Sequence, residues 1–187
     1  MTRILLLLCC MPLLCWAQLV TPSMPSARKP GGGGQCPTRP AECQVNAPVF
    51  HFGRGEMSDS APPVDAIATI SVTCTRAPVD GISVTVPFEL HALPPTPGHV
   101  MRHSFEGDWD YLRYNMFIDS ARTRLWGNGG TGTFALPGTL FLDDRNRVGT
   151  IAFPIYGRVD GAQPYIQSGQ WLGALVTRVQ YDPVCFN

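Results

Sequence analysis

One acidic cluster has the side chains that a hydrolase would need. Glu106, Asp108 and Asp110 surround Trp109 in the stretch FEGDWD. Two carboxyl groups beside an aromatic ring could serve glycoside hydrolysis, one as acid and the other as base or nucleophile. The alternative is a solvated loop between strands in which these residues have no catalytic role, and we favour this interpretation.

Three histidines could in principle bind zinc. His91, His99 and His103 lie within thirteen residues of one another, and zinc sites use histidine ligands. The surrounding segment LPPTPGHVMRH is rich in proline, so we predict a loop with exposed histidines. Ser104 beside His103 has no third partner, and G-x-S-x-G, H-E-x-x-H and phosphate-loop patterns do not occur. We therefore predict no enzyme and no cofactor.

Further polar and aromatic groups have similar double interpretations. Asp143 and Asp144 precede Arg-Asn-Arg, which indicates a charged turn, because a calcium site needs more oxygen ligands at regular spacing. Trp109, Trp126 and Trp171 could form a sugar-binding platform, but we expect the last two in the core or at its rim. The glycines of 127–132 indicate a loop rather than a phosphate site, since no lysine follows them.

The N-terminus predicts export. Residues 4–17 form the apolar run ILLLLCCMPLLCWA behind Arg3 and end in the small residue Ala17. This is the layout of a signal peptide, here 1–17, and the run is shorter than the roughly 20 residues of a spanning helix. We expect its removal and no membrane insertion afterwards. Lipidation is the alternative, but none of the cysteines in the run follows a small residue.

Removal of the signal leaves an even number of cysteines, which predicts two disulfides in an exported chain. They are Cys36, Cys43, Cys74 and Cys185. Four cysteines allow three pairings, and their spacing does not choose among them. A zinc site is the rival interpretation, but no C-x-x-C pair occurs.

Composition excludes one partner class. The chain has 14 basic and 14 acidic side chains and no basic run, whereas nucleic-acid binding needs a positive stripe. The hydrophobic fraction of 44% is ordinary for a folded domain. Residues 18–42 contain five prolines and four consecutive glycines, which predicts a flexible extension before a domain at 43–187.

Apolar residues alternate with a period of two through the domain. In 67–75 and 81–90 one face is apolar and the other polar, as in half-buried strands, and Pro87 indicates an edge strand or a bulge. Further strands are predicted at 111–118, 130–142 (a hairpin folded near Pro137–Gly138), 148–157 and 171–181. About seven short strands predict an all-β, immunoglobulin-like sandwich, with a barrel as the alternative.

Four stretches in order resemble one family. LRYNMFIDSARTRLWGNGGTGT (112–133) is similar to a segment of the spore coat protein U domain family, the pilin subunits of the archaic chaperone–usher system. CQVNAPVFHFG (43–53), IATISVTCT (67–75) and the segment 153–181 resemble its first, second and closing stretches. The matching positions are Leu112, Tyr114, Met116, Phe117, Asp119, Trp126, Gly127, Tyr156, Gly157 and Arg158.

The resemblance implies an incomplete sandwich of about six to seven strands that a partner's donor strand completes. It implies a periplasmic chaperone, an outer-membrane usher, other pilus subunits as partners, and a surface fibre for attachment and biofilm formation. It also implies a disulfide between Cys43 and Cys74. The remaining pair, Cys36 with Cys185, is less typical of the family.

The extension departs from the family pattern. A donor needs alternating apolar residues, and the candidates here are Leu19, Val20 and Met24, interrupted by prolines and followed by glycines. We therefore expect a weak donor and a minor or tip subunit. The alternative function is a stand-alone secreted sandwich that binds a ligand such as carbohydrate.

Overall fold

The computed structural model describes residues 36–55, 58, 60–93, 99–103, 111–130, 132–163 and 171–186. The predicted signal peptide 1–17 and the donor candidates Leu19, Val20 and Met24 lie outside the described residues. The carboxylate cluster beside Trp109 lies outside them as well.

The described residues form strands, turns and bends without a helix, so none of their segments could cross a bilayer as a helix. The strands are β1 (Ala41–Asn46), β2 (Val64–Arg76), β3 (Ser83–Leu93), β4 (His99–His103), β5 (Tyr111–Phe117), β6 (Leu136–Leu142), β7 (Val148–Val159), β8 (Trp171–Leu172), β9 (Val176–Tyr181) and β10 (Val184–Phe186).

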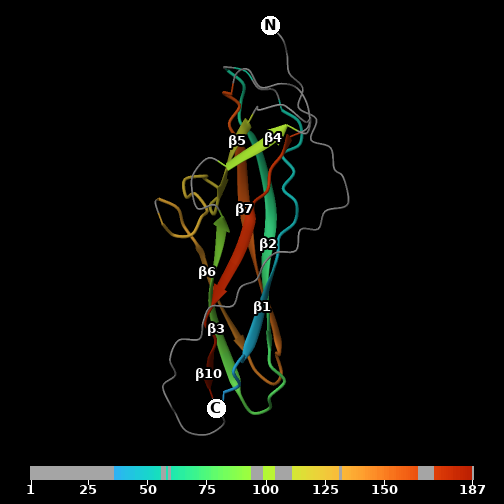
Figure 1. Cartoon of the computed structure of the whole chain (residues 1–187), viewed down its shortest axis with the longest axis vertical. Helices are drawn as coiled ribbons and strands as arrows, with labels where there is room; N and C mark the ends of the chain where they lie inside the picture. The colour runs from blue at the N-terminus through green and yellow to red at the C-terminus, as the bar shows by residue number, and fades with distance from the viewer. Residues whose placement is uncertain are drawn as a thin grey trace.

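The strands build two sheets that face each other. Sheet A has the order β1-β2-β7-β5-β4-β8, and in sheet B β3 lies between β6 on one side and β9 and β10 on the other. Figure 1 shows an elongated sandwich with β2, β3 and β7 along its long axis. The predicted all-β sandwich is confirmed.

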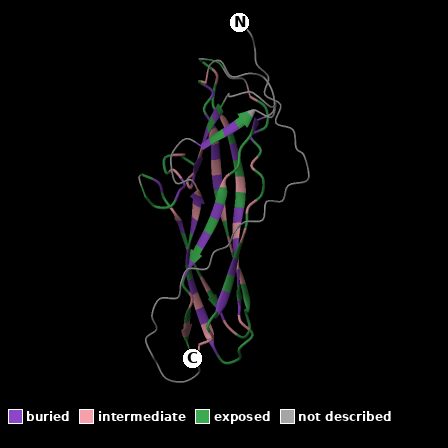
Figure 2. Ribbon diagram, in the orientation of Figure 1, coloured by how far each residue is buried: buried purple, intermediate pink, exposed green. Residues whose placement is uncertain are grey.

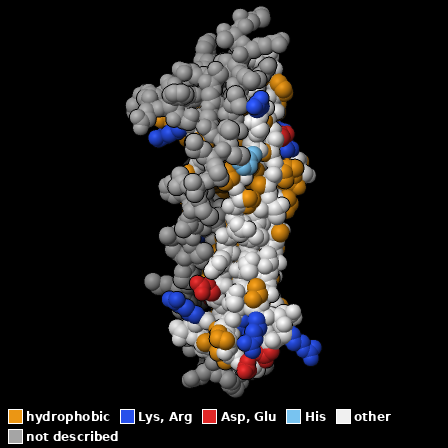
Figure 3. Space-filling view, turned by 90° about the vertical axis from the view of Figure 1, so that its right-hand side faces the viewer, with side chains coloured by type: hydrophobic (Ala, Val, Ile, Leu, Met, Phe, Trp, Pro, Cys, Tyr) orange, Lys and Arg blue, Asp and Glu red, His pale blue; other side chains and the backbone are white. Residues whose placement is uncertain are grey.

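The period of two decides which side chains enter the core. Along β2, Ile70, Val72 and Cys74 are buried, while the outward Thr73 shares a hydrogen bond of 2.9 Å with Thr150 of β7. The outer face of these strands is therefore polar around Thr73, whereas Ile67 and Val148 are exposed further along the same face. Figure 3 shows few charged side chains over the middle of the face it draws, and more of them at the lower end.

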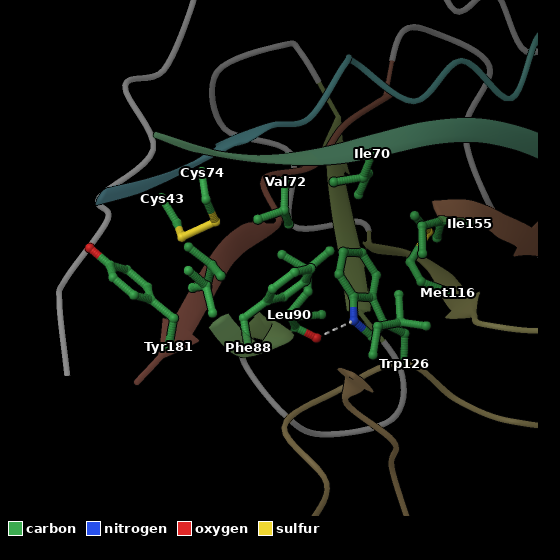
Figure 4. Packing of buried hydrophobic residues seen from close by; sticks show 14 of the residues in the cluster. Cys43, Ile70, Val72, Cys74, Phe88, Leu90, Met116, Trp126, Ile155 and Tyr181 are labelled. Carbon is green, nitrogen blue, oxygen red and sulfur yellow. Dashed lines mark hydrogen bonds between the residues drawn. A yellow bond between two sulfur atoms is a disulfide. The ribbon is translucent and has the colours of Figure 1, made fainter. Parts of the chain in front are cut away.

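The core runs between the two sheets. Figure 2 shows buried residues alternating with exposed ones along the strands. Figure 4 shows Trp126 and Phe88 between side chains of both sheets, with Ile70 and Ile155 facing them from sheet A. Phe88 meets Phe153 of β7 edge to face, with ring centroids 6.1 Å apart.

The hairpin predicted near Pro137–Gly138 is wrong. Both residues lie inside β6, in register with Glu89 and Phe88. Gly138 belongs there because a Cβ atom would approach the Phe88 ring to 2.3 Å. Proline is tolerated because β6 is at the edge of sheet B.

The edge-strand alternative for Pro87 is also wrong, because β3 has strands on both sides. Instead, the pairing on one side of β3 is interrupted opposite Pro87, because β9 ends there and β10 has not yet begun. The amide of Asp182 in this interruption donates to the Pro87 carbonyl at 3.2 Å. A proline at this position therefore costs no ladder hydrogen bond.

Candidate assembly interface

β1 and β9 are the outer strands of the two sheets on one side of the sandwich. Within the described ranges, β1 pairs with β2, and β9 pairs with β3 of the opposite sheet. The two strands lie close to each other across the space between the sheets.

Core side chains line the interior beside this edge. Thr177, Val179 and Tyr181 of β9 are buried and alternate with exposed neighbours. Cys43 of β1 is fully buried as well. Figure 4 places Tyr181 on the same side of the core as the Cys43–Cys74 disulfide. An edge built in this way has backbone groups of the outer strands beside an apolar interior.

Two disulfides hold the strands at this edge: one joins β1 to β2, and the other joins the segment before β1 to β10. Cys43 and Cys74 are directly opposite in the β1–β2 register and form one of them. Cys36 is bonded to Cys185 of β10, with a Cα–Cα distance of 6.0 Å. The chain between Cys36 and β1 therefore crosses from the edge of sheet B to the edge of sheet A.

The stretch 43–53, which resembles the first strand of the family, is only partly a strand. β1 ends at Asn46, and residues 47–53 continue without a ladder to the described strands. Phe52 is nevertheless buried and meets the Tyr114 ring at 5.8 Å, edge to face. This segment contributes aromatic side chains to the core beyond the end of β1.

The residues of the central motif hold β5 and the turn after it. Leu112 and Tyr114 are buried in β5, and burial raises the pKa of Tyr114 to about 12. Asp119 accepts hydrogen bonds from the amides of Thr123 (3.1 Å) and Arg124 (2.8 Å). Desolvation raises the pKa of Asp119, but these donors outweigh it and hold the pKa below its usual value.

Trp126 and Gly127 bring the next segment onto sheet B. The Trp126 indole is buried and its Nε1 donates to the Leu90 carbonyl at 3.1 Å. A Cβ atom on Gly127 would lie 2.4 Å from Thr133 Cβ, so only glycine fits there. The two residues therefore have structural roles, in agreement with core or rim packing of Trp126.

The closing motif forms an ion-pair cluster on sheet A. Arg158 donates to both oxygens of Asp65, at 2.7 and 2.9 Å, from the residue opposite in the β2–β7 register. Arg122 lies 3.2 Å from the same carboxylate and also lies over the Tyr156 ring, 5.8 Å from its centroid. The turn after β5 is thus bound to β2 and β7.

The motif residues described above lie within the match to a family model. The model of the Spore Coat Protein U domain matches residues 35–177, which is more than half of the chain. This chain belongs to the Spore Coat Protein U domain family. The family comprises structural subunits of the chaperone–usher pilus type rather than enzymes. No protein in the curated set matches the chain.

Acid should weaken this Spore Coat Protein U domain through Asp65. The hydrogen bond from Arg158 is the main cause that lowers the pKa of Asp65 below its ordinary value of 3.8. A lowered folded-state pKa means that the carboxylate stabilises the fold above pH 3.8, and that this contribution is lost as the pH falls through the folded value. We expect the urea concentration at the unfolding midpoint to decrease as the pH is lowered from about 5 to about 2.

Two variants isolate this carboxylate. Asp65→Asn removes the titrating group, and Arg158→Met removes the partner that lowers its pKa. Both should make the urea midpoint less dependent on pH over the same range. An unchanged pH dependence in both variants would show that other groups govern the acid response.

Gly157 is a family position that packs directly against the aromatic segment. A Cβ atom there would lie 2.8 Å from two atoms of the Phe52 ring. Gly157→Ala should therefore lower the free energy of unfolding by about 1 to 3 kcal/mol, because Phe52 must move. Gly130→Ala is the matched control, since its nearest neighbour would be an exposed Asn128 oxygen at 3.3 Å. Equal urea midpoints for the two variants would contradict the steric argument.

The prediction of loop histidines is wrong. His99 and His103 begin and end β4, and His99 is buried against the Tyr114 ring with centroids 5.3 Å apart. Burial lowers the pKa of His99 below its usual value. His91 lies in β3, 3.1 Å from Glu89. Among the described residues, no group of three metal-binding side chains occurs.

A buried arginine is the feature that sequence reasoning missed. Arg76 at the end of β2 donates to the Ile82 carbonyl at 2.7 Å and pairs with Asp144. The amide of Gly81 donates to the same carboxylate at 3.0 Å and, with Arg76, lowers the pKa of Asp144. Asp143 accepts from two amides of its own turn, which agrees with the predicted charged turn. Arg76 itself gave no signal, because its partner is 68 residues away.

Proposed function

We propose that the chain is an exported pilus subunit whose sandwich is completed by a strand from another chain. Its family supports a chaperone–usher assembly type. The observation that carries the proposal is the edge between β1 and β9, where buried side chains such as Val179 and Cys43 lie beside the outer strands of both sheets.

Donor-strand complementation follows from the cost of such an edge. Apolar core side chains that remain in contact with water, and backbone groups that remain without a hydrogen-bond partner, raise the free energy of the folded subunit. Such an edge also promotes aggregation. A periplasmic chaperone would supply a strand first, and another subunit's extension would replace it at the outer-membrane usher. The exchange forms one set of contacts as it breaks another, so it needs no cofactor and no catalytic residue.

The completed subunit would act at the cell surface. The predicted signal peptide directs the chain to the periplasm, and the usher then exports it into a fibre for attachment and biofilm formation. Pro22 separates Leu19 and Val20 from Met24, and Pro25 follows Met24, so this subunit would donate poorly. A minor or tip position needs an acceptor edge but no strong donor, and it fits this composition best.

The main test is completion of the sandwich by an added strand. The mature chain would be compared with a variant that carries a linked, ten-residue valine–threonine strand. Because an added strand buries apolar surface, we expect the melting temperature to rise by about 10 °C or more. A control strand with proline at every second position should have no effect. A lone chain that melts cooperatively at high temperature, without gain from the strand, would support the stand-alone binding module instead.

The tip position has a separate test. A peptide of residues 18–35 would compete with a shaft subunit's own extension for displacement of the chaperone from that shaft subunit. We expect slower displacement by the 18–35 peptide, since proline removes ladder donors. Equal rates would contradict the minor or tip position and leave donor-strand complementation intact.

A further inference from the structure

A shallow depression lies on the outer face of sheet B and reaches β9, the strand of sheet B at the assembly edge. Its volume is about 450 Å³. Two rows of outward side chains across β9, β3 and β6, with the link that follows β9, line it. The first row is Asp182, Pro87 and Thr139, and the second is Gln180, Glu89 and Pro137.

Exposed apolar side chains continue this surface toward the end with the C-terminus. Phe141 of β6 is 57% exposed, and Val184 and Phe186 of β10 are 46% and 50% exposed. Phe141 and Val184 flank Thr85 of β3 in one row of the sheet. Figure 1 shows β6, β3 and β10 together at this end. We call the depression and these three residues the sheet B face.

The charge of the sheet B face is negative. Glu89 has a side chain that is 59% exposed, and Asp182 is exposed at the opposite end of the depression. Among the described residues that line the depression, none is a lysine or an arginine, and Arg178, opposite His91, is exposed beyond the second row on the same face. An apolar surface of prolines and an exposed aromatic ring can bind the prolines of a proline-rich segment, and the carboxylates beside it can pair with cations of that segment. Such a segment is already extended before it binds, so its binding costs little conformational entropy.

The chain itself contains such a segment. Residues 22–30 read PSMPSARKP, with Pro22 and Pro25 three residues apart and Arg28 and Lys29 behind them. A polyproline helix has three residues per turn, so residues at this spacing share one face. The two cations match the two carboxylates of the sheet B face.

The disulfide to Cys185 brings this segment within reach. Cys185 lies between Val184 and Phe186 and is opposite Val84 in β3. From Val84 to the two rows of the depression is three to five residues, or about 10 to 17 Å along the strand. Five residues lie between Pro30 and Cys36, four of them glycine, and such a linker has an average span of about 13 Å.

We propose that residues 22–30 dock on the sheet B face of the same chain. Pro22 and Pro25 lie against the apolar surface of Pro87, Pro137 and Phe141. Arg28 and Lys29 lie beside Glu89 and Asp182. The short tether gives the segment a high effective concentration, so weak contacts suffice. A docked extension is not available as a donor; this consequence rests on the proposed function, whereas the docking itself does not.

Trypsin cleavage of the mature full chain tests the docking. Trypsin cuts after Arg28, while Pro30 blocks the cut after Lys29. Cleavage requires an undocked segment, so its rate follows the undocked fraction. We expect Glu89→Gln/Asp182→Asn to be cleaved roughly five-fold faster than the wild type, the effect of two surface ion pairs. Glu42→Gln/Asp80→Asn makes the same charge change at other exposed sites and should be cleaved like the wild type.

Each other outcome would overturn the proposal. Equal cleavage rates in all three proteins would show that the segment is undocked. Equal acceleration in both double variants would assign the effect to net charge. Protection that rises with protein concentration would place the segment on a second copy. The domain fragment must remain uncut, and this check separates the docking from any instability that the proposed assembly function predicts.

Discussion

Replacing Cys36 and Cys185 by alanine is expected to lower the free energy of unfolding by about 4 to 5 kcal/mol. The disulfide joins residues separated by 149 positions, so its loss frees a very large loop in the unfolded chain. The chain-entropy model predicts a larger effect for a larger loop. Equilibrium urea unfolding of the mature chain, with and without the substitutions, measures the difference.

The second disulfide provides the matched control. Cys43 and Cys74 are separated by only 31 positions, and the same model gives about 3.7 kcal/mol for Cys43→Ala/Cys74→Ala. The first variant should therefore be the less stable of the two. The opposite order would show that packing of the fully buried Cys43–Cys74 pair outweighs loop entropy.

Trp126→Ala is expected to lower the free energy of unfolding by about 3 to 5 kcal/mol. Trp126 is among the largest fully buried side chains, and Figure 4 shows it among residues from both sheets. Its removal leaves a cavity that the rigid strands on either side cannot close. Urea unfolding provides the measurement, and near-ultraviolet circular dichroism reports whether the remaining core is still ordered.

Trp126→Phe separates the cavity from the hydrogen bond. Phenylalanine keeps most of the ring but loses the indole donor to the Leu90 carbonyl. We expect a cost of about 1 to 3 kcal/mol, because that buried carbonyl loses its partner. If both substitutions cost the same, packing would not be the main contribution of Trp126.

These effects bear on assembly in different ways. The Cys36–Cys185 bond fixes where the extension leaves the domain, at β10. Its loss would lengthen the reach of the extension as well as destabilise the fold. Trp126 lies in the core, so its replacement should lower stability, and under the proposed function it should leave the preference for a donor strand unchanged.

Strict alternation was the reliable part of the strand prediction. Residues 67–75 and 81–90 fall largely within β2 and β3, since these strands have one apolar and one polar face. The segment 171–181 was predicted as one strand but forms β8 and β9, which belong to different sheets. Alternation identifies a strand but does not say which sheet it joins.

The errors lie where tertiary contacts outweigh local preference. β4 contains histidines after a proline-rich stretch, yet His99 is buried because Tyr114 lies opposite it in β5. Pro137 and Gly138 have the composition of a turn, yet both lie within β6. Glycine is needed there because the Phe88 ring of β3 occupies the space that a side chain on residue 138 would take. Neither contact is local in the sequence.

The sequence by itself determined that this protein is an all-β domain of the Spore Coat Protein U type, since alternation, cysteine number and motif order are properties of short stretches. The family resemblance implied the two disulfide pairs, but only the tertiary structure shows these cysteines bonded, Arg76 buried with Asp144, and β1 and β9 as the outer strands beside the core. The physical reason is distance along the chain. Each of these features joins residues that are tens of positions apart, and their meeting depends on the order of strands in the sheets rather than on the preference of any one segment.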